Sequence, residues 1–341
     1  MNTAAQPLPQ LAEIQQLPEA ERHAAYVQFI LEDTDYDNQS EDIQWHLRRR
    51  LGIGGSDLAA ILGLDPYRQA YDVWLEKTGR ELPRDLDSEN VFWGNEYEEP
   101  IAKEYCRRMK ERTGEDFKVR NKNMPAVHKE HPFLLANIDR DIVGMRRGLE
   151  IKNVGWRMAP LWGEDGTDEA AEYYIPQPHH YMLCMDYQEW DLAALIGGQE
   201  LRIYHFERDP EMDQIIIDTC RDFWFENVIA DHPPEIDLEH KRVGDLLKRA
   251  YKTISGDVVE LDSSAEAWHA TLEEAKQQVK YYQGVVDGAK HHLLHIIGDN
   301  AGGAFSDGSG YTRKTVKRSG FTVEPTEYVG FRYTKKLPIS K

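Results

Sequence analysis

The sequence has few cysteines and no long apolar run. Cys106, Cys184 and Cys220 are odd in number and widely spaced, which excludes a disulfide scaffold and indicates a reducing compartment. Three cysteines are also too few for a four-cysteine iron–sulfur cluster or zinc site. No uninterrupted apolar stretch can span a bilayer, and the first residues lack a signal-peptide pattern. We therefore expect a soluble cytoplasmic protein with no membrane partner.

Positive charge is outnumbered by negative charge, with 41 Lys and Arg against 60 Asp and Glu. The 341 residues carry a formal net charge of −19, and the sequence pI is about 5.1, which alone argues against a nucleic-acid partner. The basic residues are clustered, however. The clusters are Arg48–Arg50, then Lys118, Arg120 and Lys122, then Lys241 and Arg242, and finally Arg313 to Lys341. This distribution predicts an acidic exterior around a basic channel for DNA.

The most informative stretch consists of two apolar segments, Phe133–Val143 and Gly148–Asn153. We predict adjacent antiparallel strands that hold Asp139 and Glu150 side by side, with Lys152 on the same face as Glu150. Two close carboxylates repel each other unless a cation lies between them, and oxygen ligands favour Mg²⁺ or Mn²⁺. An E-x-K sequence is often only a solvated strand face, but these strands are too apolar for an exposed edge. The charged trio is therefore expected in a cleft.

A second candidate site is a phosphate pocket that begins with Arg48–Arg50. Glycines follow the arginines and precede Ser56 and Asp57, either of which can cap the N-terminus of a helix that continues to Leu62. Helix N-termini bind phosphate. The alternative is a tight turn before a core helix, with a basic run on the surface.

Two helices downstream supply further candidates. A helix that starts near Phe92 carries Glu98 beside its buried stripe, and a helix that starts near Pro176 carries Gln177 at its first turn. Gln177 can hydrogen-bond a water or a phosphate. The adjacent His179 and His180 do not share a helical face, so we interpret them as surface residues and not as metal ligands.

The motifs together resemble a family. W-x-x-x-R before G-I-G-G-S-D, then W-G-x-x-Y-E, I-D, L-E-I-K and Q-x-x-x-Y-M resemble the phage lambda exonuclease and YqaJ-like viral recombinases of the PD-(D/E)xK nuclease superfamily. The resemblance covers about residues 43–234. It implies an α/β (α+β) fold with a central mixed sheet flanked by helices. It also implies a Mg²⁺-dependent 5′-to-3′ exonuclease that acts on linear double-stranded DNA and leaves 3′ single strands for an annealing protein of a phage or mobile element.

The resemblance also implies a role for each site residue. Asp139, Glu150 and the backbone carbonyl of Ile151 would be metal ligands for a two-ion site, in which Mn²⁺ can replace Mg²⁺. Lys152 would position or activate the water, Gln177 would orient the nucleophile, and Glu98 would support the second ion. Arg49 with Ser56 would bind the 5′-phosphate, and Arg50 is the alternative to Arg49. Asp141 and Glu99 are likewise alternatives to Asp139 and Glu98.

We expect three segments: an N-terminal helical extension with an acidic linker (1–42), the exonuclease core (43–240) and a C-terminal extension (241–341). The extension contains a long helix over 264–297 with a coiled-coil-like apolar stripe, followed by basic strands at 311–316, 321–323 and 328–333 that contact DNA or a protein partner. The family forms ring-shaped homo-oligomers, with a trimer as the expected state. The alternative functions are a non-catalytic DNA-end-binding protein and a restriction endonuclease of the same superfamily.

Overall fold

The structure is a computed structural model that describes residues 9–81, 89–122, 125–251, 256 and 258–317. It divides into two compact units, Met1–Leu247 and Lys248–Lys341, which we describe separately. Within the described residues, no helix is both long enough and apolar enough to cross a membrane.

The first unit is built on a mixed sheet with the strand order β2-β5-β6-β7-β8. Its strands are β2 (Val119–Arg120), β5 (Arg140–Ile142), β6 (Arg147–Val154), β7 (Glu189–Ile196) and β8 (Glu200–Glu207). β6 and β7 are parallel, and the other pairs are antiparallel. β6 and β7 have almost continuous buried runs, as expected for strands covered on both faces.

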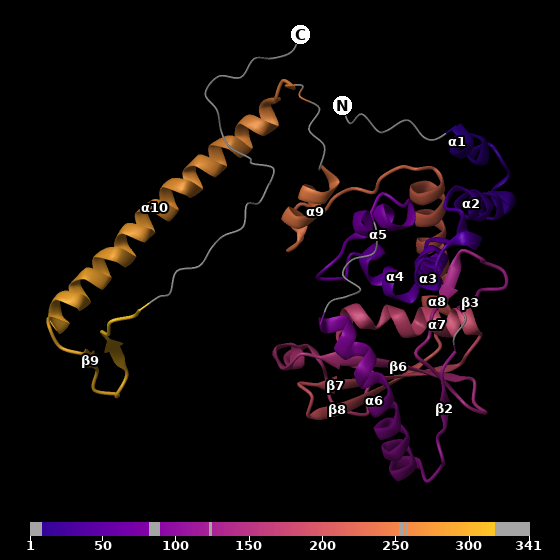
Figure 1. Cartoon of the computed structure of the whole chain (residues 1–341), viewed down its shortest axis with the longest axis horizontal. Helices are drawn as coiled ribbons and strands as arrows, with labels where there is room; N and C mark the ends of the chain where they lie inside the picture. Colours follow the sequence, from indigo (N-terminus) through magenta and orange to yellow (C-terminus); the bar gives the residue numbers. More distant parts are fainter. Residues whose placement is uncertain (1–8, 82–88, 123–124, 252–255, 257, 318–341) are drawn as a thin grey trace. The chain divides into compact units, whose positions relative to one another are not determined.

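Helices cover both faces of this sheet (Figure 1). On one face, α6 (Glu89–Thr113) packs Ile101 and Tyr105 against Leu149 and Ile151 of β6. On the other face lie α7 (Pro176–Met185), α4 (Gly55–Ile61), α5 (Ala70–Lys77), α8 (Pro210–Asp222) and the π-helix Phe223–Ile229. The predicted α+β fold with a central mixed sheet flanked by helices is confirmed.

A smaller sheet corrects one part of the prediction. We expected Phe133–Val143 to form a single strand, but it is divided between two sheets. β4 (Leu134–Ala136) pairs in parallel with β1 (Ile53–Gly54) and antiparallel with β3 (Ala126–Val127), whereas β5 belongs to the larger sheet. β4 does not pair with β6, and its three residues are buried where β4 packs against α7. Asp139 lies in the short crossing between the two sheets.

The N-terminal helices pack on the same core. They are α1 (Pro9–Gln15), α2 (Glu19–Asp33), the 3₁₀ helix Tyr36–Asn38 and α3 (Glu41–Arg50). Pro18 lies between α1 and α2, as predicted for a residue that cannot continue a helix. Tyr26 of α2 is buried edge-on against Trp224, so this segment contributes to the main apolar core.

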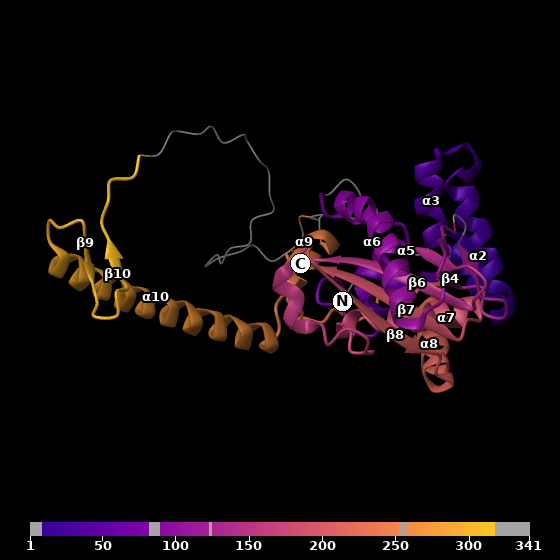
Figure 2. The same cartoon turned by 90° about the horizontal axis from the view of Figure 1, so that it is seen from below.

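The second unit consists mainly of α10 (Ser263–Ile297), which follows α9 (Val243–Ala250) in the chain. The hairpin β9 (Gly302–Ala304) and β10 (Gly310–Thr312) lies beside one end of α10 (Figure 2). The predicted long helix is confirmed. The strand predicted at 311–316 is shorter than expected, because β10 ends at Thr312 and residues 313–317 are not in a strand. The predicted strands at 321–323 and 328–333 lie outside the described residues.

Candidate active site

The strand pairing of β5 with β6 brings the two predicted carboxylates together. Arg140 is opposite Leu149, so the residues one step outward, Asp139 and Glu150, are neighbours. Asp139 accepts a hydrogen bond at Oδ2 from the backbone N–H of Ile151 (2.8 Å). Leu149 and Ile151 are buried beneath α6, which leaves Glu150 and Lys152 on the α7 side of β6. The alternation predicted for this strand is confirmed.

Glu150 has one oxygen in contact with two donors and one without any. Its Oε1 accepts hydrogen bonds from Lys152 Nζ (2.6 Å) and from Gln177 Nε2 (2.8 Å). Its Oε2 is buried and has no hydrogen-bond partner among the described residues. A buried carboxylate oxygen without a donor is costly and calls for a ligand.

The electrostatics of the pair point the same way. Burial raises the pKa of Glu150 to about 8, the negative charge of Asp139 adds to the increase, and Lys152 opposes it. Burial also raises the pKa of Asp139, again against the effect of Lys152. The carboxylates therefore hold their protons more tightly than usual in the free protein, which is the behaviour of two acids that need a cation between them.

Lys152 remains charged in this environment. Burial by itself would lower its pKa, but Glu150 and Asp139 outweigh that effect and raise it. Its Nζ lies 5.1 Å from the centre of the Tyr174 ring. Lys152 also lines a second cavity with Tyr67, Tyr173 and Ser56, next to the cavity that contains the carboxylates.

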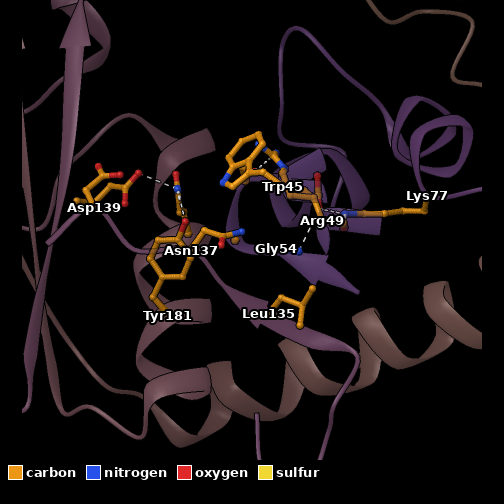
Figure 3. A pocket seen from close by; sticks show the side chains of 13 residues that line it. Trp45, Arg49, Gly54, Lys77, Leu135, Asn137, Asp139 and Tyr181 are labelled. Carbon is orange, nitrogen blue, oxygen red and sulfur yellow. Dashed lines mark hydrogen bonds and ion pairs between the residues drawn. The ribbon is translucent and has the colours of Figure 1, made fainter. Parts of the chain in front are cut away.

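A cavity of about 230 Å³ joins the carboxylates to the predicted phosphate pocket. Figure 3 shows Asp139 and Arg49 on opposite sides of this cavity, with Asn137 between them. The guanidinium of Arg49 lies 5.0 Å from the centre of the Trp45 ring and donates from Nη2 to Ser56 Oγ (3.4 Å). Ser56 is exposed in the first turn of α4, so an arginine, a hydroxyl and a helix N-terminus converge here.

Arg50 has a different environment from Arg49. Its Nε donates to the backbone carbonyl of Lys77 (3.3 Å), and its guanidinium fills the space beside Gly79. Arg50 does not line the cavity. Of the two alternatives, Arg49 is therefore the one that lines the cavity.

The predicted cap of α4 was wrong. The N-cap is Gly54, and α4 begins at Gly55. Asp57 points inward, where it accepts from the backbone N–H of Gly54 (3.0 Å) and pairs with Lys77 (2.6 Å) and Arg68 (3.3 Å). Burial by itself would raise the pKa of the Asp57 carboxyl, but Lys77 and Arg68 outweigh it and hold that pKa below its usual range.

The two alternative acids are held elsewhere. Asp141 is bound by Arg120 (2.6 Å) and by the hydroxyl of Tyr187 (2.7 Å), outside the cavity. Glu99 is exposed and lies 3.2 Å from Lys103. These contacts favour Asp139 over Asp141.

Glu98 is half-buried and accepts from Arg140 Nη1 (2.9 Å). Burial raises its pKa, and the charge of Asp139 adds to the increase. Glu98 is thus close enough for the charge of Asp139 to affect its pKa, although its carboxylate is paired with Arg140.

The surface interpretation of both histidines was wrong for His180. Its ring is fully buried, and its Nε2 contacts the backbone carbonyl of Leu135 (3.0 Å). Burial lowers its pKa to about 4, so the ring is neutral. α7 is covered by β4 on this side, which buries a residue that helical spacing alone placed at the surface.

The donor set fits a hard divalent ion. Among the residues that the structure describes, no three His, Cys, Asp or Glu side chains are arranged to hold a metal by themselves. The cavity offers two carboxylates, and Mg²⁺ typically takes one or two carboxylates and completes its shell with waters and substrate phosphate oxygens. The buried Oε2 of Glu150 is the atom that most needs such an ion.

Comparison with known proteins supplies the family. A model described as the YqaJ-like viral recombinase domain matches residues 44–188. The protein YqaJ of Bacillus subtilis (strain 168) is 31% identical over 258 residues, which cover 75% of this chain and 78% of that protein. The chain belongs to the YqaJ-like viral recombinase family. The resemblance found from the motifs is confirmed.

Two further similarities are more limited. Protein D345L of African swine fever virus (strain Badajoz 1971 Vero-adapted) is 38% identical over 60 residues, 18% of this chain and 17% of that protein. An alkaline exonuclease from Laribacter hongkongensis has a TM-score of 0.41 and 16% sequence identity, over 61% of this chain and 98% of that chain.

Three polar residues that line the cavity of this YqaJ-like protein were given no role from the sequence: Lys77, Asn137 and Tyr181, the tyrosine of the Q-x-x-x-Y-M motif. Asn137 is two residues before Asp139, and Tyr181 is one helical turn after Gln177. Both spacings predict that each residue lies on the same side as its neighbour in the site. No such spacing indicates Lys77, because its role depends on α5 packing beside α4.

Proposed function

We propose that this protein is a Mg²⁺-dependent exonuclease that degrades one strand of linear double-stranded DNA in the 5′-to-3′ direction and leaves 3′ single-stranded overhangs. One observation carries the proposal. Asp139, Glu150 and the phosphate-binding candidates Arg49 and Ser56 line one cavity, with Lys152 against Glu150. A cavity with a metal site at one side and a cation at the other suits a DNA terminus, because both the scissile and the terminal phosphate need a partner.

Each residue then has a distinct role. Asp139, Glu150 and the backbone carbonyl of Ile151 would hold the metal, and Glu98 would support a second ion. When bound, divalent ions lower the pKa of water from about 15.7 towards neutrality and stabilise charge on phosphoryl oxygens. Lys152 provides a fixed positive charge next to Glu150 for the water or the phosphate.

Gln177 orients the site from α7. Its Nε2 donates both to Glu150 (2.8 Å) and to the Tyr181 hydroxyl (2.8 Å), so its amide is fixed with respect to the metal ligand. We propose that its remaining oxygen orients the nucleophile. Arg49, stacked on Trp45, would bind the 5′-phosphate together with Ser56.

The proposal extends to partners. We propose that the substrate is linear duplex DNA with a 5′-phosphate. The 3′ overhang is then passed to a single-strand annealing protein during recombination of a phage or mobile element. The enzyme acts in the host cytoplasm as a ring-shaped homo-oligomer, a trimer. The clustering of cations in an otherwise acidic chain supports contact with DNA at a restricted surface.

A linear 5′-phosphorylated duplex labelled at one 3′ end tests the function. With Mg²⁺, we expect progressive shortening of the labelled strand, abolished in Asp139→Ala and Lys152→Ala. Lys103→Ala is the matched control, because Lys103 is exposed and pairs only with Glu99 in the described contacts.

Three outcomes would contradict the proposal. Binding of DNA ends without degradation would indicate an end-binding protein, and discrete fragments from circular DNA would indicate a restriction endonuclease. Undiminished degradation by Lys152→Ala would remove the proposed role of that residue.

A further inference from the structure

α10 carries a heptad repeat along its whole length. Apolar residues alternate at spacings of three and four from Ala265 to Ile296. The series is Ala265, Trp268, Leu272, Ala275, Val279, Tyr282, Val286, Ala289, Leu293 and Ile296. Every a position (the series that includes Leu272) and every d position (the series that includes Trp268) is therefore filled by a residue that can pack in a coiled-coil core. A 3.5-residue period sustained over four heptads is the pattern of a coiled coil.

Among the described residues of the second unit, no segment buries this stripe. α10 is described over its full length and contains no buried residue. Trp268 and Val279 are each 69% exposed, and Ile296 is 78% exposed. Single exposed apolar residues are ordinary, but a continuous stripe along a helix of 35 residues is typical of an interaction surface.

The helix itself needs such a contact. Gly284 and Gly288 lie in its interior, and each costs roughly 1 kcal/mol relative to alanine. Most helices in proteins obtain their stability from packing of an apolar face and not from intrinsic propensity. α10 therefore requires a partner to be stable as a single long helix.

We propose that the partner is α10 of a second copy of this protein, in an antiparallel coiled coil. The apolar series is self-complementary in that direction. Ala265 would face Ile296, Trp268 would face Leu293, Leu272 would face Ala289, Ala275 would face Val286, and Val279 would face Tyr282. Each alanine thus packs against a larger side chain, which fills the core evenly.

A parallel pairing in register would pack poorly. Ala275 and Ala289 would each pack against the same residue of the second copy and leave cavities. The Trp268 and Tyr282 layers would each contain two large aromatic side chains and be overpacked. Uneven layers cost stability through cavities and strain. The antiparallel arrangement has a two-fold axis, so both copies use the same surface.

The charges beside the stripe also permit self-association. At the e positions, Lys276 and Lys290 are already paired on their own helix, with Glu273 (2.7 Å) and Asp287 (3.9 Å). The g positions are Thr271, Gln278, Val285 and His292, none of which carries a fixed charge. Charges at e and g normally decide which helices repel each other, and no strong repulsion arises here.

The buried area is adequate for a stable contact. With two aromatic and several aliphatic side chains in the stripe, each helix would bury on the order of 800 Å², which is the amount that a standard specific interface buries per partner.

Two adjacent tyrosines provide a matched test. Tyr282 lies at a d position and Tyr281 lies outside the stripe, yet they are 64% and 67% exposed. Light scattering on the full-length protein should show an even number of copies, which is six where the proposed ring also forms, because α10 pairs then join two trimers. Tyr282→Glu should halve this mass, and Tyr281→Glu should leave it unchanged. A monomeric wild-type protein at micromolar concentration, or equal effects of the two substitutions, would overturn the proposal.

Cysteine cross-linking tests the direction of the helices. In a Cys106→Ser background, which removes the one native cysteine that is not buried, Ala275→Cys and Val286→Cys proteins should form a disulfide when mixed and none when oxidised separately. Cross-linking of Ala275→Cys alone would indicate parallel helices and refute the antiparallel arrangement. Neither experiment depends on nuclease activity, so failure of the proposed enzyme function would leave this inference standing.

Discussion

Replacement of Gly55 by alanine tests whether close contact between α4 and α7 shapes the site. A methyl group at this position would lie 2.7 Å from Tyr181 Cε1 and 3.1 Å from Gln177 Cγ. Carbon atoms pack at about 3.5–4.0 Å, so one element must move by roughly 1 Å. The Tyr181 ring cannot move away freely, because it is 3% exposed and packs against Trp190.

The size of the effect follows from this crowding. Overpacking of a dense core costs about 1–3 kcal/mol. For a unit of this size, each kcal/mol lowers Tm by roughly 2–4 °C. Displacement of Gln177 also disturbs its 2.8 Å contact with Glu150, and a misplacement of about 1 Å can reduce a rate by up to ~100-fold. We therefore expect Gly55→Ala to lose both stability and exonuclease rate.

Gly94→Ala is the matched control for thermal melting and for the exonuclease assay. Gly94 also lies in a helix, α6, but a methyl group there would meet nothing within 4 Å. Removal of a helical glycine normally stabilises by up to ~1 kcal/mol, so Gly94→Ala should melt at the wild-type temperature or above it. A Gly55→Ala protein that has the same Tm as Gly94→Ala and retains full activity would refute the packing argument.

Two further predictions concern the phosphate pocket and its foundation. Arg49→Ala should reduce the preference for 5′-phosphorylated over 5′-hydroxyl ends by roughly 10- to 100-fold, because a charge-assisted hydrogen bond is lost, whereas Arg50→Lys should retain the preference. Degradation rates measured on both substrates test this, and an unchanged preference in Arg49→Ala would contradict the assignment. Asp57→Asn should destabilise the protein by about 3–5 kcal/mol at pH 7 in denaturant titrations, because it leaves Lys77 buried without its counter-charge. Because the pKa of Asp57 is lower in the folded protein, its contribution to the free energy of unfolding is complete above about pH 4 and declines as the pH falls further. The difference in unfolding free energy between wild type and Asp57→Asn should therefore narrow below that pH, and a constant difference would argue against the ion pair.

The sequence predicted the carboxylate pair well because strand alternation depends on local spacing. Glu150 and Lys152 had to share a face once Leu149 and Ile151 were buried, and Asp139 followed from the antiparallel pairing. The break between β4 and β5 was missed because the apolar residues on both sides of Asn137 are equally compatible with one strand or two.

Other features depend on contacts between distant segments. Ser56 or Asp57 was predicted to cap α4, as both residue types favour, but the N-cap is Gly54, and Asp57 is buried in an ion pair with Lys77 of α5. His180 was placed at the surface because helical spacing does not reveal that a second sheet covers that side of α7. In both cases the deciding neighbour is more than fifteen residues away in the chain.

The central claim is that Asp139 and Glu150 together hold a divalent ion, and calorimetric titration with Mg²⁺ or Mn²⁺ in the absence of DNA tests it most directly. The wild-type protein should bind the ion, and Asp139→Asn and Glu150→Gln should each weaken binding by at least ~10-fold while keeping the fold. Asp141→Asn, whose carboxylate contacts Arg120 and Tyr187, should bind as the wild type does. Equal binding by all four proteins, or a loss confined to Asp141→Asn, would contradict the account.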